Sequence, residues 1–583
     1  MDEEKPDIIA QAEAETPAEA TPVFGETTSE EQSTKKSKKP LYAFAVILCL
    51  AVIGAATWFL FKNKDANTPA QNQVSNNQQE TPALEPVEAS KLALKGNDLS
   101  DFDLAFLHLE NKQDNVVYSP LSIKYALAML KDGANGRSKE QIEALIGDYT
   151  PKAYLNSANR SLANAMFVRD SFKERVLDSY TNTLESKYHA SVVLDSFANA
   201  EPLNKWVSDR TLGIINQFVD DEAVKDLDFM LVNALAIDMK WNNQLQCAPN
   251  SEDTSRPPCI YYNVRYSHEN YSDWISEIFE EESFDKMTFN NHENVKSAKI
   301  GASINRYDIV KELGEEAIRN KVEEEYQKWV AEQKAKFPNS EIGYPATADD
   351  YLRSAYPKFQ NGDDYDGLSK YIQELDANYG KTAVSTDFYF LDNDSERVFA
   401  KNLQEYDGTT LQYVGIMPKS GSLNAYLNNL NAAKVSSLIA NLKDPNDANN
   451  FKDGVITKIT AHIPFFNFEY EMKDFQTNLE SLGVTDVFDT RTADLTNMVA
   501  GEKGEYIDAA IHKADINFSN DGIKAAAATG FGGRGAAGPW DYKFDVPVEE
   551  IDLTFDQPFL FLIRDKNTGE VWFTGTVYNP GKE

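Results

Sequence analysis

The chain has 583 residues and a formal net charge of −35, and 42% of its residues are hydrophobic. This length suits one large domain with additions or two to four ordinary domains. The negative charge argues against nucleic acid as a partner, because phosphate recognition needs clustered Lys and Arg.

The N-terminal part divides into three segments. Residues 1–40 are polar and have no hydrophobic period, which predicts a disordered segment. Residues 41–61, LYAFAVILCLAVIGAATWFLF, carry no charge and are about long enough to span a hydrocarbon core of roughly 30 Å, so we expect one transmembrane helix. A cleaved signal peptide is the alternative, but the apolar run is long for one and 40 residues precede it. Residues 62–91 predict a flexible stalk.

Charges beside the apolar segment indicate its orientation. Four lysines lie just before it, at positions 35, 36, 38 and 39, and positive charge is retained on the cytoplasmic side. We therefore expect a single-pass protein of the cell membrane with a cytoplasmic N terminus and an extracellular folded part. Oxidation is permitted outside the cell, and for Cys247 and Cys259 both a disulfide and two free thiols remain open.

From about residue 92 the chain mixes helical and strand patterns without a regular βαβ rhythm, which favours an α+β class. Helical periodicity covers 125–133 and 203–219. Strand patterns cover 228–241, 410–417, 458–470 and 558–565.

Residues 245–385 differ in character, because they are acidic and rich in Tyr. Apolar residues recur there every four or five positions, which predicts an amphipathic helix over 309–337 with a charged outer face. These residues are Ile309, Leu313, Ile318, Val322, Tyr326 and Val330.

The sequence contains no convincing motif for catalysis, nucleotide binding or metal binding. The glycines at 530, 532 and 535 have dinucleotide-loop spacing, but an alanine run precedes them and Pro539 follows, where a strand and a helix are needed. The 6 histidines form no zinc-binding spacing. No Gly-x-Ser-x-Gly elbow or phosphate loop is present. We expect no enzyme activity, no cofactor and no metal.

Five stretches together resemble the serpin family of serine protease inhibitors, and they occur in the family's order. They are NVVYSPLSIKYALAMLKDGANGRSKEQI (115–142), LNKWVSDRTLGII (203–215), LVNALAIDMKW (231–241), LESLGVTDVFDTRTADLTNM (479–498) running on into IHKADINFSNDGIKAAAATG (511–530), and FDQPFLFLIRDKNTGEVWFTGTVYNP (555–580).

The resemblance implies a serpin fold, with a large central antiparallel-rich sheet, additional sheets and surrounding helices. The serpin domain would occupy 92–244 and 386–583, with a reactive-centre loop at about 520–550 and an insertion over 245–385. In this family a target protease cleaves the loop. The freed part then enters the large sheet as a new strand and carries the acylated protease with it.

The hinge of that loop would be the stretch from Gly522 to Thr529. In a strand its side chains alternate between the two faces of the sheet, and small residues let the sheet accept them. Ile523 and Lys524 depart from the family pattern, in which a small and an acidic residue stand there. The branched Ile523 would slow the first step of insertion, and slow insertion turns an inhibitor into a substrate. The hinge residues are Gly522, Ile523, Lys524, Ala525, Ala526, Ala527, Ala528 and Thr529.

Counting along the family pattern from Gly522 places the cleaved bond between Ala536 and Ala537. A small residue before the bond suits a serine protease with a small, apolar pocket, of elastase or subtilisin type. Arg534 is the competing choice and would suit a trypsin-like protease. The segment between Ala536 and Pro558 is longer than in many family members, which leaves both choices open.

Further residues match positions that control the sheet in this family. Ser119, Ser122, Asn233 and His512 match a polar cluster beneath the sheet, which would hold the sheet closed without taking part in catalysis. Trp241 matches the residue at the point of loop entry.

The resemblance implies a monomeric suicide inhibitor of extracellular proteases, displayed at the cell surface. The alternative is a non-inhibitory surface binding or adhesion protein that keeps the fold and acts through its insertion. The insertion itself is either a solvated, partly helical elaboration or a module that docks a partner.

Overall fold

The computed structural model describes residues 98–242, 285–355, 367–369, 371–372, 383–384, 388–519, 522–523, 544 and 546–581, except residues 342, 502 and 509. The chain divides into two compact units, 1–80 and 81–583, and every described residue belongs to the second. The predicted disordered segment, transmembrane helix and stalk lie outside the described residues, as do Cys247, Cys259 and positions 524–543. Within the described ranges, no helix has the length and apolar character needed to cross a membrane.

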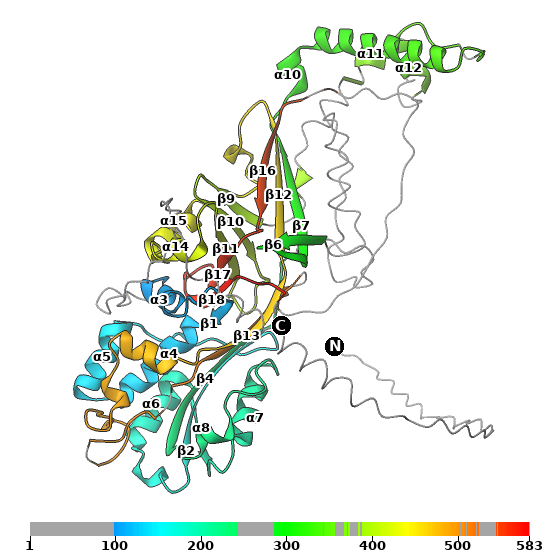
Figure 1. The fold of residues 1–583 in the computed structure, drawn as a ribbon. Helices are drawn as coiled ribbons and strands as arrows, with labels where there is room; N and C mark the ends of the chain where they lie inside the picture. Colours follow the sequence, from blue (N-terminus) through cyan, green and yellow to red (C-terminus); the bar gives the residue numbers. More distant parts are fainter. Residues whose placement is uncertain are drawn as a thin grey trace, which may run out of the picture. The chain divides into compact units, whose positions relative to one another are not determined.

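Helices and strands alternate irregularly along the chain, as the predicted α+β class requires (Figure 1). The helices before the insertion are α3 (Asp101–Leu109), α4 (Pro120–Gly133), α5 (Gly136–Ile146), α6 (Asp178–Tyr188), α7 (Glu201–Arg210) and α8 (Asp221–Val224). Those after it are α14 (Leu423–Leu427), α15 (Ala432–Ala440) and α16 (Phe475–Ser481). Short 3₁₀ turns cover Lys173–Arg175, Ala448–Asn450 and Asp486–Phe488.

Two helix boundaries have clear local causes. Helix α4 begins at a Ser-Pro pair, in which the Ser119 side chain accepts a hydrogen bond from the Ser122 N–H and Pro120 takes the first helical position. Helix α7 ends at Arg210, short of the predicted 219. The chain leaves the helix because Leu212 and Gly213 adopt φ angles of 57° and 71°.

A six-stranded antiparallel sheet forms the centre of the molecule. Its order is β1 (Val116–Tyr118), β18 (Val571–Val577), β17 (Phe559–Asp565), β11 (Leu411–Pro418), β10 (Glu396–Asn402) and β9 (Phe388–Asp392). All residues of β11 and β18 are buried, so both faces of these strands are covered. Residues 559–563 of β17 between them are also all buried, which explains why the FLFLI run has no alternation.

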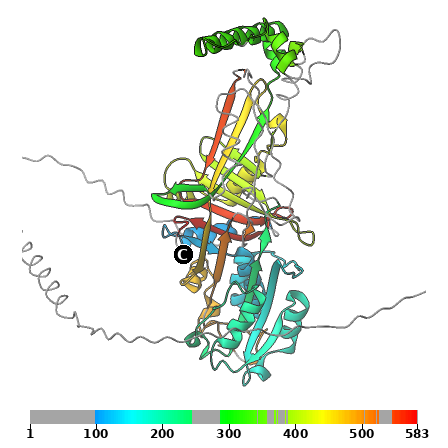
Figure 2. The ribbon, with the colours of Figure 1, turned by 90° about the vertical axis from the view of Figure 1, so that its right-hand side faces the viewer.

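A second sheet contains long strands that reach into the insertion (Figure 2). Its strands are β16 (Val548–Thr554), β12 (Ile456–Pro464), β7 (His292–Asn305) and β6 (Asp285–Phe289), and β8 (Ala383–Val384) pairs with β7. Strand β7 pairs with β12 over nine residue pairs, from Asn305↔Ile456 to Ser297↔Pro464. Residues 285–305, which we assigned to the insertion, therefore build this sheet together with the C-terminal half of the chain.

The remaining strands form two smaller sheets side by side. One contains β3 (Ser191–Asp195), β2 (Arg160–Arg169) and β4 (Phe229–Ile237). The other contains β13 (Phe466–Glu471), β14 (Lys513–Phe518), β15 (Gly522–Ile523) and β5 (Met239–Lys240). Only Asp238 separates β4 from β5, so the chain passes directly from one sheet to the other.

The insertion also forms a helical unit, here called the inserted module: α10 (Ile309–Leu313), α11 (Glu315–Lys336) and α12 (Ala348–Ala355). The single helix predicted over 309–337 is interrupted at Gly314, whose φ is 81°. Five of the six predicted apolar positions are buried, whereas Leu313, next to the break, is 41% exposed. The break turns Leu313 away from the face that the period predicts.

Candidate functional site

An open slot lies between β4 and β14. The structure pairs β4 with β2 on one side, and in the part of the chain that it describes no strand pairs with the other side. Strand β14 pairs with β13 on one side, and on its slot side it pairs with β15 at Phe518↔Ile523. The spacing of the two strand edges has the form of a site for one further strand.

A cavity of about 220 Å³ marks the slot. Residues 235–237 of β4 and 515–517 of β14 form its walls, and residues 213–215, just after α7, border it. Its lining extends to Ile563 and Phe573 of the six-stranded sheet. Apolar side chains inserted here would be shielded from water by the core beneath.

The predicted hinge begins inside the sheet, at the end of the slot. Gly522 lies opposite Lys240, and Ile523 lies opposite Met239 on one side and Phe518 on the other. The Ser519 N–H, just after β14, donates to the Gly522 carbonyl oxygen at 3.0 Å. The first two residues of the hinge are thus already a strand between β5 and β14.

Gly522 is required by close packing. A Cβ atom at this position would lie 2.3 Å from the Met239 carbonyl oxygen and 2.6 Å from the Lys240 Cα. Both are backbone atoms, which cannot move aside as a flexible side chain can. Only glycine lets the hinge approach β5 this closely.

Trp241, which the resemblance places at the point of loop entry, lies beside the first residues of the predicted hinge. Its side chain is buried, and its indole Nε1–H donates to the Ser519 carbonyl oxygen at 2.9 Å. Its ring meets Phe518 and Tyr413 edge-on, with centroids 5.3 and 6.1 Å away. Trp241 thus connects the end of β5 to Ser519, before the predicted hinge.

The structure brings together three of the four residues of the predicted polar cluster. The Ser119 N–H donates to His512 Nε2 at 3.0 Å, and the Ser122 N–H donates to the Ser119 hydroxyl at 3.1 Å. Asn233 instead donates to Asn164 Oδ1 at 2.7 Å, and its own Oδ1 is buried without a hydrogen-bond partner. Because Asn233 lies on β4 and His512 directly precedes β14, the open slot separates them.

His512 is held neutral. Burial lowers the pKa of its imidazole to about 4, because the charged form loses its hydration. The geometry agrees, since Nε2 accepts the Ser119 N–H and therefore carries no proton itself. The imidazole serves as a buried hydrogen-bond acceptor at the start of α4.

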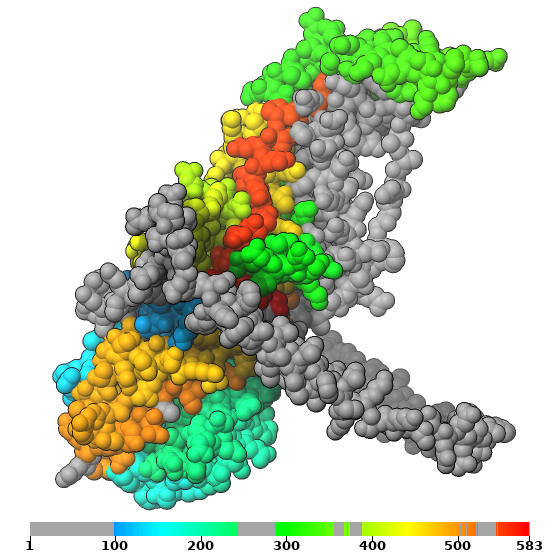
Figure 3. Space-filling view, in the orientation of Figure 1, coloured from blue at the N-terminus to red at the C-terminus, as the bar shows by residue number. Residues whose placement is uncertain are grey.

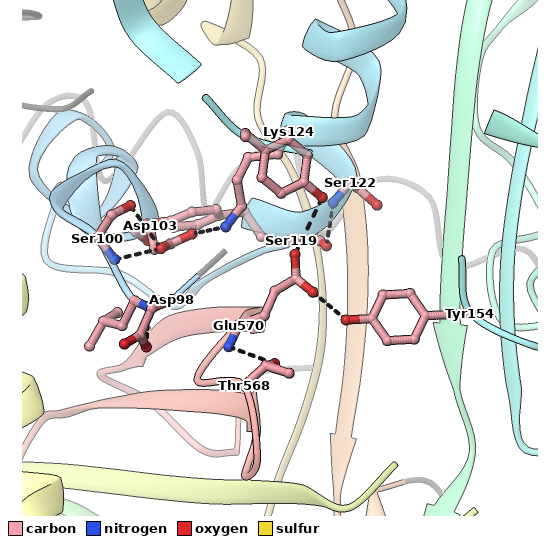
Figure 4. A network of polar contacts seen from close by, with 12 residues as sticks. Asp98, Ser100, Asp103, Ser119, Ser122, Lys124, Tyr154, Thr568 and Glu570 are labelled. Atoms are coloured by element: carbon pink, nitrogen blue, oxygen red, sulfur yellow. Dashed lines mark hydrogen bonds and ion pairs between the residues drawn. The ribbon is translucent and has the colours of Figure 1, made fainter. Parts of the chain in front are cut away.

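Sequence reasoning missed a buried ionic network beside this cluster (Figure 4). Lys124 Nζ lies 2.8 Å from Asp103 Oδ1, and both side chains are fully buried. Glu570 accepts hydrogen bonds from Tyr149, at 3.3 Å, and from Tyr154. Burial raises the pKa of Glu570, and the Tyr154 hydrogen bond and the charge of Lys124 oppose that rise. The available signal was Lys124 itself, a charged residue inside the otherwise apolar start of α4.

The described residues contain no group of three or more His, Cys, Asp or Glu side chains placed to hold a metal ion. The predicted cleavage positions Ala536, Ala537 and Arg534 lie outside them, as do hinge residues 524–529.

Among the described residues no strand lies between β4 and β14, and the first two residues of the predicted hinge pair between β14 and β5. The family model described as Serpin (serine protease inhibitor) matches residues 100–254 and 365–580, which is more than half of the chain. The chain therefore belongs to the serpin family, and the resemblance seen in the sequence is confirmed. The unmatched range contains β6, β7 and the inserted module.

Curated relatives match short stretches of the chain. Serpin B10 of Rattus norvegicus is 32% identical over 123 residues, which are 21% of this chain and 28% of that protein. Leukocyte elastase inhibitor A of Mus musculus is 36% identical over 122 residues, 21% of this chain and 29% of that protein. The chain thus spans less than a third of either relative.

Among solved structures, the native state of the thermophilic serpin tengpin is similar, with a TM-score of 0.50 and 18% sequence identity. The match covers 88% of this chain and 97% of tengpin. At this identity the likeness shows the shared fold alone.

Proposed function

We propose that this protein is a suicide-type inhibitor of serine proteases, and that an N-terminal transmembrane helix displays it at the cell surface. The observation that carries the inhibitory part is the slot between β4 and β14, which holds no strand of the described residues and has Gly522 and Ile523 paired at its end. Family membership supports the same activity.

The chemistry belongs to the protease. Its serine hydroxyl attacks the carbonyl carbon of Ala536, the bond to the Ala537 nitrogen breaks, and the serine proton passes through the protease's base to the leaving amine. An ester then joins the protease to Ala536. Residues 523–536 number about fourteen, and at roughly 3.3 Å each they would carry the protease about 45 Å when they enter the slot.

The substrate class follows from the residue before the cleaved bond. Alanine suits a protease with a small, apolar pocket, and the likeness to a protein named leukocyte elastase inhibitor A supports an elastase-type target. Cleavage after Arg534 would indicate a trypsin-like target instead.

Membrane display rests on the uncharged run 41–61 and the lysines before it. Adding a protease to intact cells tests it, because an extracellular serpin domain would be digested while residues 1–40 stay protected. A folded domain that is protected until the cells are opened would reject the proposed location.

Inhibition is tested by incubating the full chain with elastase-, subtilisin- and trypsin-type proteases, followed by denaturing gels and intact masses. We expect a complex that survives denaturation and a released C-terminal peptide that begins at Ala537. Clean cleavage without a complex across the panel would favour the non-inhibitory surface protein that acts through its inserted module.

A further inference from the structure

The hydrophobic core of the inserted module includes residues from outside the module. One apolar cluster contains Ile309, Ile318, Val322, Tyr326 and Val330 of α10 and α11, together with residues of α12. The same cluster contains Phe544 and Val546, each only 2% exposed. These two residues lie between the predicted cleavage position and β16, so part of the module's core comes from the far end of the reactive-centre loop.

Backbone contacts join the same parts. The Ile456 N–H of β12 donates to the Pro547 carbonyl oxygen at 3.0 Å, and the next pairs run in parallel from Ile456↔Val548 to His462↔Thr554. Ile456 also belongs to the module's apolar cluster. Figure 3 shows β16 running along the surface to the helices of the module. We call residues 544, 546 and 547 the stem.

The stem limits how far an uncleaved loop can enter the slot. About twenty residues separate Ile523 from Phe544, and at roughly 3.3 Å each they reach about 66 Å. An intact loop must run into the slot and return to the stem, so about half of that length is available for insertion. Insertion of all fourteen residues from 523 to 536 therefore requires cleavage, or release of the stem followed by separation of β16 from β12.

We propose that the inserted module clamps the stem and thereby keeps the uncleaved loop out of the slot. The clamp acts through Phe544 and Val546, which must leave the module's core before β16 can separate. The module then keeps the uncleaved loop outside the slot, where a protease can bind and cleave it. This inference rests on the proposed function, because a clamp on the loop matters only if the slot accepts it.

The test compares the full chain with the variant Phe544→Ala/Val546→Ala. The matched control, Phe388→Ala/Val398→Ala, removes the same side chains from buried positions in β9 and β10. Hydrogen exchange of the β16 amides measures release of the stem, and intact mass excludes cleavage. We expect the β16 amides to exchange on the order of tenfold or more faster in the stem variant than in the control.

A second variant, Ile318→Ala, changes the module without touching the loop and should also accelerate β16 exchange. Incubation of each uncleaved protein should then show a faster gain in thermal midpoint in both variants than in the control, as their loops enter the slot. Equal β16 exchange in the stem variant and the control would overturn the clamp. A wild-type protein that gains no stability after cleavage of its loop would instead overturn the inhibitory function.

Discussion

The indole nitrogen of Trp241 donates a hydrogen bond to the carbonyl oxygen of Ser519 at 2.9 Å. This bond connects the end of β5 to Ser519, which directly follows β14 and precedes the predicted hinge. It spans 278 positions of the sequence, so it forms only when β5 and β14 are both in place.

Replacing Trp241 with Phe keeps an aromatic ring and removes this bond. We expect a loss of about 1 kcal/mol in the free energy of unfolding, because the Ser519 carbonyl loses its donor. Urea denaturation measures it. Trp329→Phe, in the inserted module, is the control. If both variants lose the same stability and the amides of residues 518, 519, 522 and 523 exchange hydrogen at the same rate in both, the hinge role of Trp241 is refuted.

Gly522→Ala tests the close approach of the hinge to β5. The added Cβ would overlap the Met239 carbonyl, so we expect about 1–3 kcal/mol of destabilisation and displacement of β15 from the sheet. Inhibition assays should show more cleaved protein per complex formed. Gly343→Ala is the control, since its Cβ would meet no atom within 4 Å. Unchanged inhibition by Gly522→Ala would show that this pairing is dispensable.

Ile523→Ser tests whether the branched side chain that already lies between β5 and β14 slows the entry of the residues after it. A small side chain should let the flanking strands separate more easily, so we expect more covalent complex and less cleaved product at equal protease. Quantifying both species on denaturing gels measures the ratio. A ratio equal to that of wild type would remove Ile523 as the limiting step.

The lowered pKa of His512 should make the free energy of unfolding depend on pH. Its folded-state pKa of about 4 lies below the unfolded value of 6.5, so protons bind the unfolded chain first as pH falls. Its stabilising contribution is complete above pH 6.5 and is lost between pH 6.5 and about 4, by on the order of 3 kcal/mol. Denaturant midpoints of wild type and His512→Gln should show a flatter profile for the variant in that window; parallel profiles would contradict it.

The buried pair of Lys124 and Asp103 should behave as a coupled unit. Lys124→Met leaves the Asp103 carboxylate buried without its cation, which costs about 3–5 kcal/mol. We expect the double variant Lys124→Met/Asp103→Asn to lose less stability than the sum of the single changes. A double-mutant cycle in denaturant measures the coupling, and strict additivity would show that the two charges do not interact.

Much of this protein was predictable from local patterns. The Ser119-Pro120 start of α4, the LVNALAI strand and the C-terminal FLFLI strand are short-range signals, and together they identified the serpin family and the α+β class. The alanine run predicted the hinge, because small residues suit a strand that must enter a packed sheet, and that assignment stays a prediction for residues 524–529. The transmembrane helix and the cleaved bond stay predictions.

Other features required the tertiary structure. Strand β7 pairs with β12, more than 150 residues away, so the place of the β6–β7 hairpin in a sheet with the C-terminal half of the chain left no local mark. The apolar cluster that Phe544 and Val546 share with the inserted module and the ion pair of Lys124 with Asp103 depend on the same long-range packing. The sequence determined which segments form helices and strands and which family they belong to. Only the tertiary structure decided which strands pair with one another and which buried charges form ion pairs. Periodicity in the sequence indicates that a residue is buried, but it does not indicate which residue lies next to it.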